Sequence, residues 1–336
     1  MDKKVEISKE ERPLMVTIRC ITYNHEPYIR QCLEGFIMQK TNFRFEAIVH
    51  DDASTDGTAD IIREYAEKYS DIIKPIFETE NQYSKRDGSL ARIMDEHTHG
   101  KYVAMCEGDD YWIDPLKLQK QVDFLEKHHD YSLVYSKIKC YSQSENRVKA
   151  IFGKERKNLK DRLMKECFIG TCTSCFRTCD YFDYIHEIQP NKHDWLMGDV
   201  PLFLYLGTKG FGKMFNECMG VYRILQSSAS HSDDVDLQLK RIRNTIDIYT
   251  FFANRYYPDN NRIKNKLLGG YLYRVYMLFK GKNRPLPDNY KQDICSYTGT
   301  HFKLHIVRIV LLCPFFSKLL DFLIKFRMSL IIRLYK

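Results

Sequence analysis

The stretch FEAIVHDDASTDGT, at residues 45–58, decides the fold of this chain. It begins with an apolar run, Phe45–Val49, that is typical of a buried strand, and an acidic string at 50–58 follows directly. A second stretch, YVAMCEGDDYW at residues 102–112, has the same order, with its acidic string at 107–112. Carboxylates that gather at strand ends are costly unless a cation or hydrogen-bond donors lie between them. We therefore expect a divalent metal ion and a nucleotide to bind beside these two strings.

The segments around these stretches alternate between strand and helix patterns. Apolar runs predict strands at 15–21, 45–49, 72–77, 102–106, 132–139 and 167–176. Helical spacing predicts helices that start at Pro27 and Pro115 and helices near 59–69, 90–97 and 199–206. Such alternation is typical of an α/β fold with a mostly parallel sheet covered by helices on both faces. Ligands of these sheets bind beyond the strand C-termini, where 22–24, 51–56 and 107–110 are all expected to lie.

Composition indicates a globular chain with a modest basic excess. The 336 residues include 13% aromatic and 29% charged residues, and 52 Lys and Arg stand against 44 Asp and Glu. The basic residues concentrate at 301–336, which hold seven Lys or Arg and one acid, Asp321, among apolar residues. No stretch there reaches the roughly 18 uninterrupted apolar residues of a spanning helix. This pattern predicts either a basic amphipathic helix on an anionic membrane surface or a basic helix packed on its own domain.

The chain changes texture near residue 235, where helical, Tyr-rich and basic sequence begins. We therefore expect a catalytic domain at 1–235 and a helical C-terminal region at 236–336. The first residues are charged and have no apolar core of an export signal, and the 11 cysteines are then expected to be reduced thiols. Together these features predict a cytoplasmic protein that is peripheral on the inner face of the membrane if the basic helix binds lipid.

Four motifs in this order resemble those of the family 2 glycosyltransferases. They are ITYN at 21–24, DDASTDGT at 51–58, EGDDYW at 107–112, and Gly198-Asp199 followed by VYR at 221–223. The resemblance covers roughly 14–230 and implies a GT-A fold and a mostly inverting transfer from a nucleotide-activated sugar. It implies a nucleotide-sugar donor, with a UDP-sugar expected, and a hydroxyl acceptor on a glycan. The basic tail at 301–336 indicates a lipid-linked acceptor, as in surface polysaccharide synthesis.

The resemblance also implies which residues bind the donor. Asp52 matches the acid that accepts a hydrogen bond from the uracil ring, and Tyr23, next to Thr22, matches an aromatic that lies against the base. Arg223 would contact the diphosphate with its forked donors, and Asp109 is a further expected nucleotide-binding residue.

A divalent cation is expected at the second acidic string. Asp109 and Asp110 match the acids that hold Mn²⁺ or Mg²⁺, because hard oxygen ligands suit these ions. Glu107 is a supporting acid at a position where relatives often have Asp. The alternative is a solvated acidic turn before Pro115.

The resemblance places the general base of the transfer at Asp199. Asp194 is the fallback base, and the alternative for Asp199 is that it only caps the helix that follows. Many relatives have an acid where this chain has Gly198, and they often have His where it has Leu225, which leaves His231 as a distant candidate ligand.

Other site classes and functions have weaker sequence support. Cys172 and Cys175 have the spacing of a zinc knuckle, but their apolar surroundings favour buried free thiols. A nucleotidyltransferase would need a Gly-rich phosphate loop, and a non-catalytic sugar-nucleotide binder would be expected to lack the acids. Nucleic acid is not an expected partner, because no basic patch interleaved with aromatics lies near the sheet edge.

Overall fold

The computed structural model describes residues 12–153, 155, 158–225 and 234–312. Within these residues the chain forms two compact units. The first contains the described residues up to Asp194 and those from Gly198 to 225. The second contains Trp195–Met197 and the described residues from 234 onward. The predicted residues His231 and 313–336 lie outside the described residues.

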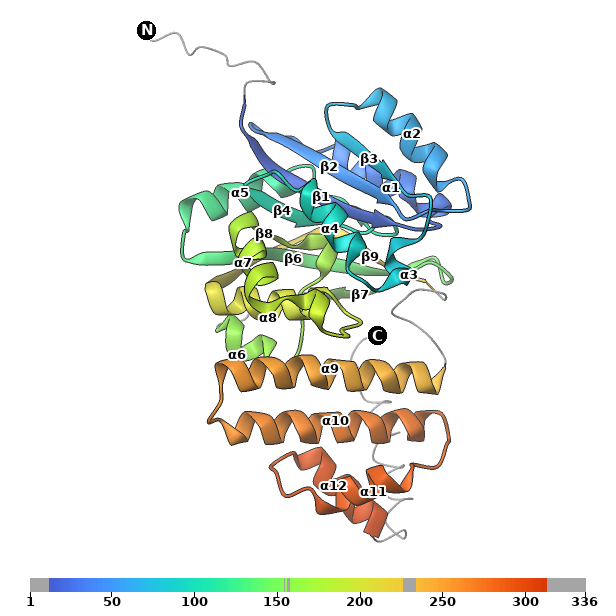
Figure 1. The fold of residues 1–336 in the computed structure, drawn as a ribbon, viewed down its shortest axis with the longest axis vertical. Helices are drawn as coiled ribbons and strands as arrows, with labels where there is room; N and C mark the ends of the chain where they lie inside the picture. The colour runs from blue at the N-terminus through green and yellow to red at the C-terminus, as the bar shows by residue number, and fades with distance from the viewer. Residues whose placement is uncertain (1–11, 154, 156–157, 226–233, 313–336) are drawn as a thin grey trace. The chain divides into compact units, whose positions relative to one another are not determined.

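The first unit is built on one nine-stranded sheet in the order β3-β2-β1-β4-β8-β6-β9-β5, with β7 paired to β6 (Figure 1). Its strands are β1 (Leu14–Thr22), β2 (Arg44–Asp51), β3 (Ile73–Phe77), β4 (Tyr102–Met105), β5 (Tyr111–Trp112), β6 (Tyr131–Ser142), β7 (Arg147–Phe152), β8 (Cys175–Arg177) and β9 (Phe211–Ile224).

The sheet has a parallel part and a mixed part. Strands β3, β2, β1 and β4 pair in parallel, as the alternation of strands and helices predicts. Beyond β4 the pairs with β8 are antiparallel, β6 and β9 are parallel, and the short β5 returns antiparallel to β9. This last pair brings the second acidic string next to the end of β9.

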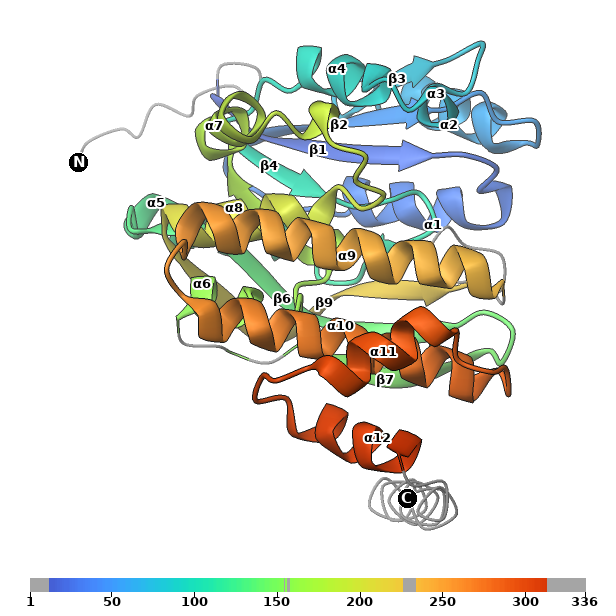
Figure 2. The same cartoon turned by 60° about the horizontal axis from the view of Figure 1, so that its bottom comes forward.

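Helices cover both faces of the parallel part. In Figure 2 α4 lies above β1 and β2, and α1 lies below them. The helices of this unit are α1 (Glu26–Ile37), α2 (Thr58–Lys68), α3 (Gln82–Lys85), α4 (Ser89–Glu96), α5 (Lys117–Lys127), α6 (Leu159–Leu163), α7 (Thr178–Ile188) and α8 (Asp199–Lys209). Two 3₁₀ turns, η2 (Thr171–Thr173) and η3 (Pro190–Lys192), accompany them. The α/β fold class with helices on both faces is confirmed.

The core of this unit explains why the local patterns are readable. The apolar spacing of α1 buries Ile29, Leu33 and Phe36 completely against the central strands. Strand β1 is buried along most of its length, as a central parallel strand must be. Burial of side chains on both faces gives these strands their continuous apolar runs.

One element prediction is wrong. The residues 167–176 were expected to form a strand, but they contain η2 and only the beginning of the three-residue strand β8. The Ser174 hydroxyl donates to Thr171 O at 2.8 Å, and this local bond closes a turn where a strand would need extended backbone. The sequence patterns also missed α3, α6, α7 and the exposed strand β7.

The second unit is helical. It contains α9 (Val235–Tyr256), α10 (Asn261–Gly281), α11 (Asp288–Ser296) and α12 (Phe302–Leu312). Helices α9 and α10 lie side by side along their length (Figure 1), and α11 and α12 pack on α10. Their shared core includes Leu239, Leu272, Val275 and Ile294. None of the described helices is both long and apolar enough to cross a membrane.

Candidate active site

Three loops meet at the C-terminal ends of β1, β2 and β4. Thr22 and Asp51, the last residues of β1 and β2, are paired in register, and Asp52 N donates to Thr22 O at 2.9 Å. On the other side of β1, Gly108 N donates to Ile21 O at 3.0 Å. A Cβ on Gly108 would lie only 2.6 Å from Thr22, so this close approach requires glycine. The structure thus brings together the three segments that the sequence places at the sheet edge.

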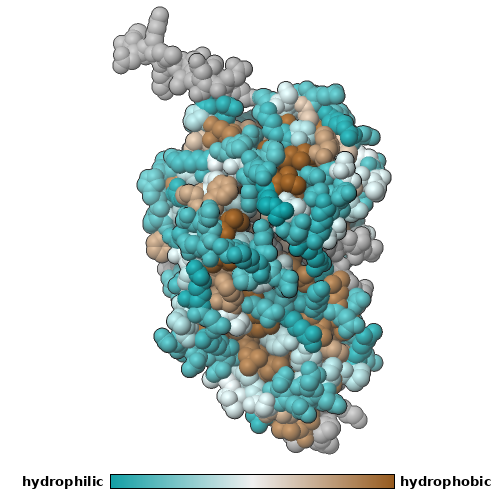
Figure 3. All heavy atoms as spheres, in the orientation of Figure 1, coloured by the Kyte–Doolittle hydropathy of each residue, from teal (hydrophilic) through white to brown (hydrophobic). Residues whose placement is uncertain are grey.

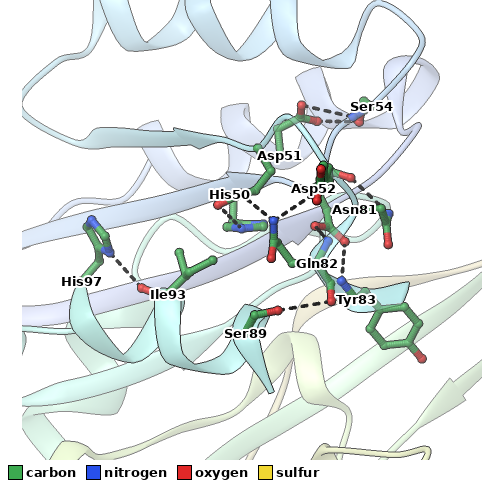
Figure 4. A network of polar contacts seen from close by, with 12 residues as sticks. His50, Asp51, Asp52, Ser54, Asn81, Gln82, Tyr83, Ser89, Ile93 and His97 are labelled. Atoms are coloured by element: carbon green, nitrogen blue, oxygen red, sulfur yellow. Dashed lines mark hydrogen bonds and ion pairs between the residues drawn. The ribbon is translucent and has the colours of Figure 1, made fainter. Parts of the chain in front are cut away.

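Asp52, the predicted base-reading acid, is 1% exposed and anchors the next loop (Figure 4). Its Oδ1 accepts from Gln82 N at 2.6 Å, and its Oδ2 accepts from Tyr83 N at 3.1 Å. The Asn81 amide in addition donates to Asp52 O at 3.1 Å. Each carboxylate oxygen keeps a second lone pair, so the group can accept one more donor while it holds this loop.

The turn after β1 carries Tyr23 at its surface. The Tyr23 side chain is 44% exposed, whereas Thr22 is buried and its hydroxyl lies 3.0 Å from His25 Nδ1. Asn24 adopts a left-handed backbone with φ of 54°, and its Oδ1 accepts from Thr55 N at 2.8 Å. The first acidic string therefore fixes this turn in place and leaves the Tyr23 ring open to contact a ligand.

The second acidic string places several carboxylates in a shared field. Burial, with the nearby charges of Asp109 and Asp199, raises the pKa of Glu107 to about 7. Burial also raises the pKa of Asp110 well above its usual range, and Asp109 and Glu107 add to this rise. The raised pKa values mean that negative charge here is not fully compensated by the protein.

Asp110 and Arg223 join this string to the end of β9. Asp110 Oδ1 accepts from Arg223 N at 2.8 Å, and Arg223 Nε donates to Asp109 O at 2.7 Å. The two terminal nitrogens of Arg223 donate to Gln143 and Gln31, each at 2.8 Å. Arg223 is 5% exposed, so much of its donor capacity is already directed at protein acceptors.

The Arg223 guanidinium also lies between two aromatic rings. Its central carbon is 4.8 Å from the centre of the Tyr28 ring and 5.1 Å from that of Tyr111. The sequence motif marks Arg223 and Tyr111, but no pattern marks Tyr28 or the two glutamines as its partners. These residues connect α1 to the acidic string.

Asp199, the predicted base, is the first residue of α8 and is partly buried. Its Oδ2 accepts from the Thr171 hydroxyl at 3.1 Å, and its Oδ1 accepts from Val200 N at 2.8 Å. Its charge contributes to the raised pKa of Glu107, which places it within electrostatic reach of the second acidic string. Asp194, the fallback base, is exposed.

Thr171 and His25 are site residues that the sequence patterns did not identify. Thr171 lies in η2, which was expected to be strand, so its contact with Asp199 had no sequence signal. His25 lies in the charge field of Asp109, and burial lowers its pKa although that carboxylate opposes the shift.

The carboxylate oxygens of the second acidic string are of the type that binds a hard cation, but these side chains do not form a preformed metal site. Within the described ranges no three His, Cys, Asp or Glu side chains are grouped as a metal site. The carboxylate oxygens of the second acidic string are nevertheless the ligand type of Mg²⁺ and Mn²⁺, and their uncompensated charge favours a cation. Cys172 and Cys175 are buried free thiols, and Cys179 is exposed on α7.

Comparison with known proteins agrees with this architecture. Residues 17–185 match the model of Glycosyl transferase family 2. An uncharacterized protein of Mycobacterium tuberculosis is 35% identical over 229 residues, which are 66% of this chain and 62% of that protein. This chain thus spans less than two thirds of the length of that relative.

Two further proteins, one a sequence relative and one a solved structure, are similar to this chain. An Escherichia coli protein, UDP-Glc:alpha-D-GlcNAc-diphosphoundecaprenol beta-1,3-glucosyltransferase WfaP, is 26% identical over 47% of this chain and 59% of its own. The mannosyltransferase PcManGT of Pyrobaculum calidifontis, solved with GDP-Man and Mn²⁺, superposes with a TM-score of 0.52 at 16% identity, over 93% of this chain and 91% of its own. The structural likeness agrees with a GT-A fold for the sheet unit. The family match covers half of the sequence, and the chain belongs to glycosyl transferase family 2.

Proposed function

We propose that this glycosyltransferase is an inverting enzyme that moves a sugar from a UDP-sugar to a hydroxyl of a glycan or lipid-linked acceptor, in surface polysaccharide synthesis. The observation that carries the proposal is the link through η2, where the Thr171 hydroxyl donates to Asp199 at 3.1 Å and the next residue, Cys172, accepts at its O from Trp112 Nε1 of the second acidic string at 2.6 Å. This link brings a candidate base beside a candidate diphosphate site. The name of WfaP describes a UDP-sugar donor and a diphosphoundecaprenol-linked acceptor for that relative, which supports the same classes here.

The donor would lie along the C-terminal ends of β1, β2 and β4. The exposed Tyr23 ring would stack on the base, beside Thr22, and Asp52 would accept a hydrogen bond from the base with a remaining lone pair. Arg223 and Asp109 would lie at the diphosphate, where Arg223 has guanidinium N–H groups beyond those it donates to the protein.

We place a Mn²⁺ or Mg²⁺ ion at the second acidic string, with Asp109 and Asp110 as its holders and Glu107 in support. When bound, such an ion would neutralise the charge that develops on the diphosphate leaving group. Asp110 Oδ1 accepts from Arg223 N and the carboxylate also contacts the Cys172 thiol, and these contacts orient it toward the second acidic string. The raised pKa of Glu107 fits a group whose ionised form a bound cation would favour.

Asp199 would remove the proton of the attacking acceptor hydroxyl. The Thr171 hydroxyl and Val200 N each donate to one of its oxygens and hold the carboxylate in one orientation. A base fixed in this way on the acceptor side supports direct displacement, which inverts the configuration at the sugar carbon.

The test is a panel of UDP- and GDP-sugars with Mn²⁺, in which release of nucleoside diphosphate is measured for the wild type and for Asp109→Asn. We expect release from at least one UDP-sugar by the wild type and loss of it in the variant. Proton NMR of the glycoside formed should show the anomeric configuration opposite to that of the donor. Retention of configuration, or turnover that Asp109→Asn leaves unchanged, would contradict the proposal.

A further inference from the structure

Helix α12 has two apolar faces, and within the described part of the chain only one of them is covered. Leu304, Val307 and Val310 are buried on the side that packs on the rest of the helical unit. Phe302 is 75% exposed, Ile309 is 53% exposed and Leu312 is 60% exposed. Phe302 and Ile309 are seven residues apart, which places them on nearly the same side of a helix. Leu312 follows Ile309 by three residues, so all three exposed side chains share one face. Large apolar side chains grouped at the surface mark an interaction site more often than scattered ones do.

The charged residues of α12 itself are basic. Lys303 lies on α12 and extends over the Tyr273 ring, with its nitrogen 5.4 Å from the ring centre. It has no carboxylate partner among the residues that the structure describes. Arg308 donates to Tyr297 O at 3.4 Å from the same helix. Neither Asp nor Glu occurs in the sequence of α12.

The neighbouring helix α10 adds charge of the same sign. Its basic residues are Arg262, Lys264, Lys266, Arg274 and Lys280, and its sequence contains no acid. His301, just before α12, has a pKa lowered by burial and by the positive charges of Lys303 and Lys266. The local potential is therefore positive at the start of α12. The 24 residues that follow α12 in the sequence, 313–336, continue the mixture of apolar and basic residues with one acid, Asp321.

We propose that the outer face of α12, formed by Phe302, Ile309 and Leu312, docks on an anionic lipid bilayer. The apolar side chains would enter the headgroup and acyl boundary, and Lys303 and Lys266 would contact the negative headgroups. The charge decides between occupants, since a second copy of this face would bring like charges together, whereas an anionic membrane complements both its apolar and its basic part. Figure 3 shows apolar side chains at the surface where α11 and α12 end the helical unit.

Membrane docking is a property separate from sugar transfer, so vesicle binding is measured without any sugar donor. The full chain is mixed with vesicles of phosphatidylcholine that contain about 30% phosphatidylglycerol, or with pure phosphatidylcholine vesicles, and bound protein is recovered by flotation. We expect binding to the anionic vesicles only, and weaker binding at high salt because the attraction is screened.

Two variants separate the apolar from the charged contribution. Phe302→Ser/Ile309→Ser/Leu312→Ser should lower the bound fraction at least about tenfold at limiting lipid, because one exposed face is removed. Lys266→Glu/Lys303→Glu should lower it by about threefold to tenfold. The matched control is Val148→Ser/Ile151→Ser/Phe211→Ser, which removes three equally exposed apolar side chains from the sheet unit and should leave binding unchanged.

Circular dichroism and sedimentation velocity on the same proteins check the fold and the oligomeric state. Equal flotation of the α12 apolar variant and the wild type, or equal binding to neutral vesicles, would overturn the proposal. A wild type that sediments as a dimer, with an α12 variant that is monomeric and floats as before, would instead identify this face as a contact between copies.

Discussion

The first and second acidic strings follow strands on either side of β1, but their carboxylates lie in different surroundings. In the first, both oxygens of Asp52 accept backbone N–H groups of the 82–83 segment. In the second, burial and mutual repulsion raise the pKa values of Glu107 and Asp110. The position of an acid at the sheet edge therefore does not determine its role. The groups that compensate the charge of an acid determine its role. An acid whose oxygens accept fixed N–H groups holds a loop in place. Acids with few such donors form a site where a bound cation is stabilised most.

The largest effect is expected from Asp199, the base that we propose beside the second string. Asp199→Asn keeps the size of the side chain but removes the base, and we expect kcat to fall about a thousandfold. Donor affinity, measured by titration calorimetry, should remain within about twofold, since Asp199 touches no donor group in this account. Asp194→Asn is the matched control and should retain activity, and the base assignment fails if the two variants have equal rates.

The first string should respond to amide substitution through both binding and stability. In Asp52→Asn one of the two backbone N–H groups of 82–83 faces an amide N–H₂, so a buried donor loses its acceptor. We expect unfolding to become easier by about 1–3 kcal/mol and the donor KM to rise, with kcat less affected. Chemical denaturation and steady-state kinetics measure the two effects. A fall in kcat alone would assign Asp52 to the chemistry of the second string.

Stability should depend on pH through Glu107 of the second string. The folded pKa of about 7 lies above the ordinary value of 4.5. The stability that the neutral carboxyl contributes is therefore fully present below pH 4.5 and is lost as pH rises through about 7. Without added metal, the wild type should lose about 3 kcal/mol across this range relative to Glu107→Gln, as measured by urea unfolding. If the free energy of unfolding changed with pH in the same way in both proteins, ionisation of Glu107 would not destabilise the fold.

The smallest effect is expected at the rim of the first string. Tyr23→Ala removes one exposed ring that lies in no core, so we expect no change in stability and a threefold to tenfold rise in donor KM, equivalent to about 1 kcal/mol. Tyr23→Phe keeps the ring and is the control. A KM for Tyr23→Ala equal to that of the wild type would remove the stacking role.

The strand–helix alternation and the meeting of three loops at one edge could be predicted from the sequence, because the central strands are buried on both faces. The sequence of such a strand is a continuous run of apolar residues, and parallel pairing brings the C-terminal ends of these strands together. The segment 167–176 could not be read in the same way, because its apolar residues serve a turn closed by Ser174. Apolar pattern alone does not distinguish these two uses.

The candidate site was readable only in part. Motif residues such as Asp109, Asp199 and Arg223 carry a sequence signal, whereas their partners do not. Thr171 and Gln143 reach the site through tertiary contacts over long sequence separations, and nothing in their own neighbourhoods marks them. Which acids are anchored and which are uncompensated is a property of these contacts and could not be predicted from the motifs.

The most direct test of the contrast between the two strings is calorimetric titration of UDP with and without Mn²⁺. We predict that Mn²⁺ tightens UDP binding to the wild type and to Asp52→Asn by a similar factor, although the variant binds more weakly. In Asp109→Asn the effect of Mn²⁺ should disappear. Tightening by Mn²⁺ that persists in Asp109→Asn, or that is lost in Asp52→Asn alone, would contradict the division of roles between the two acidic strings.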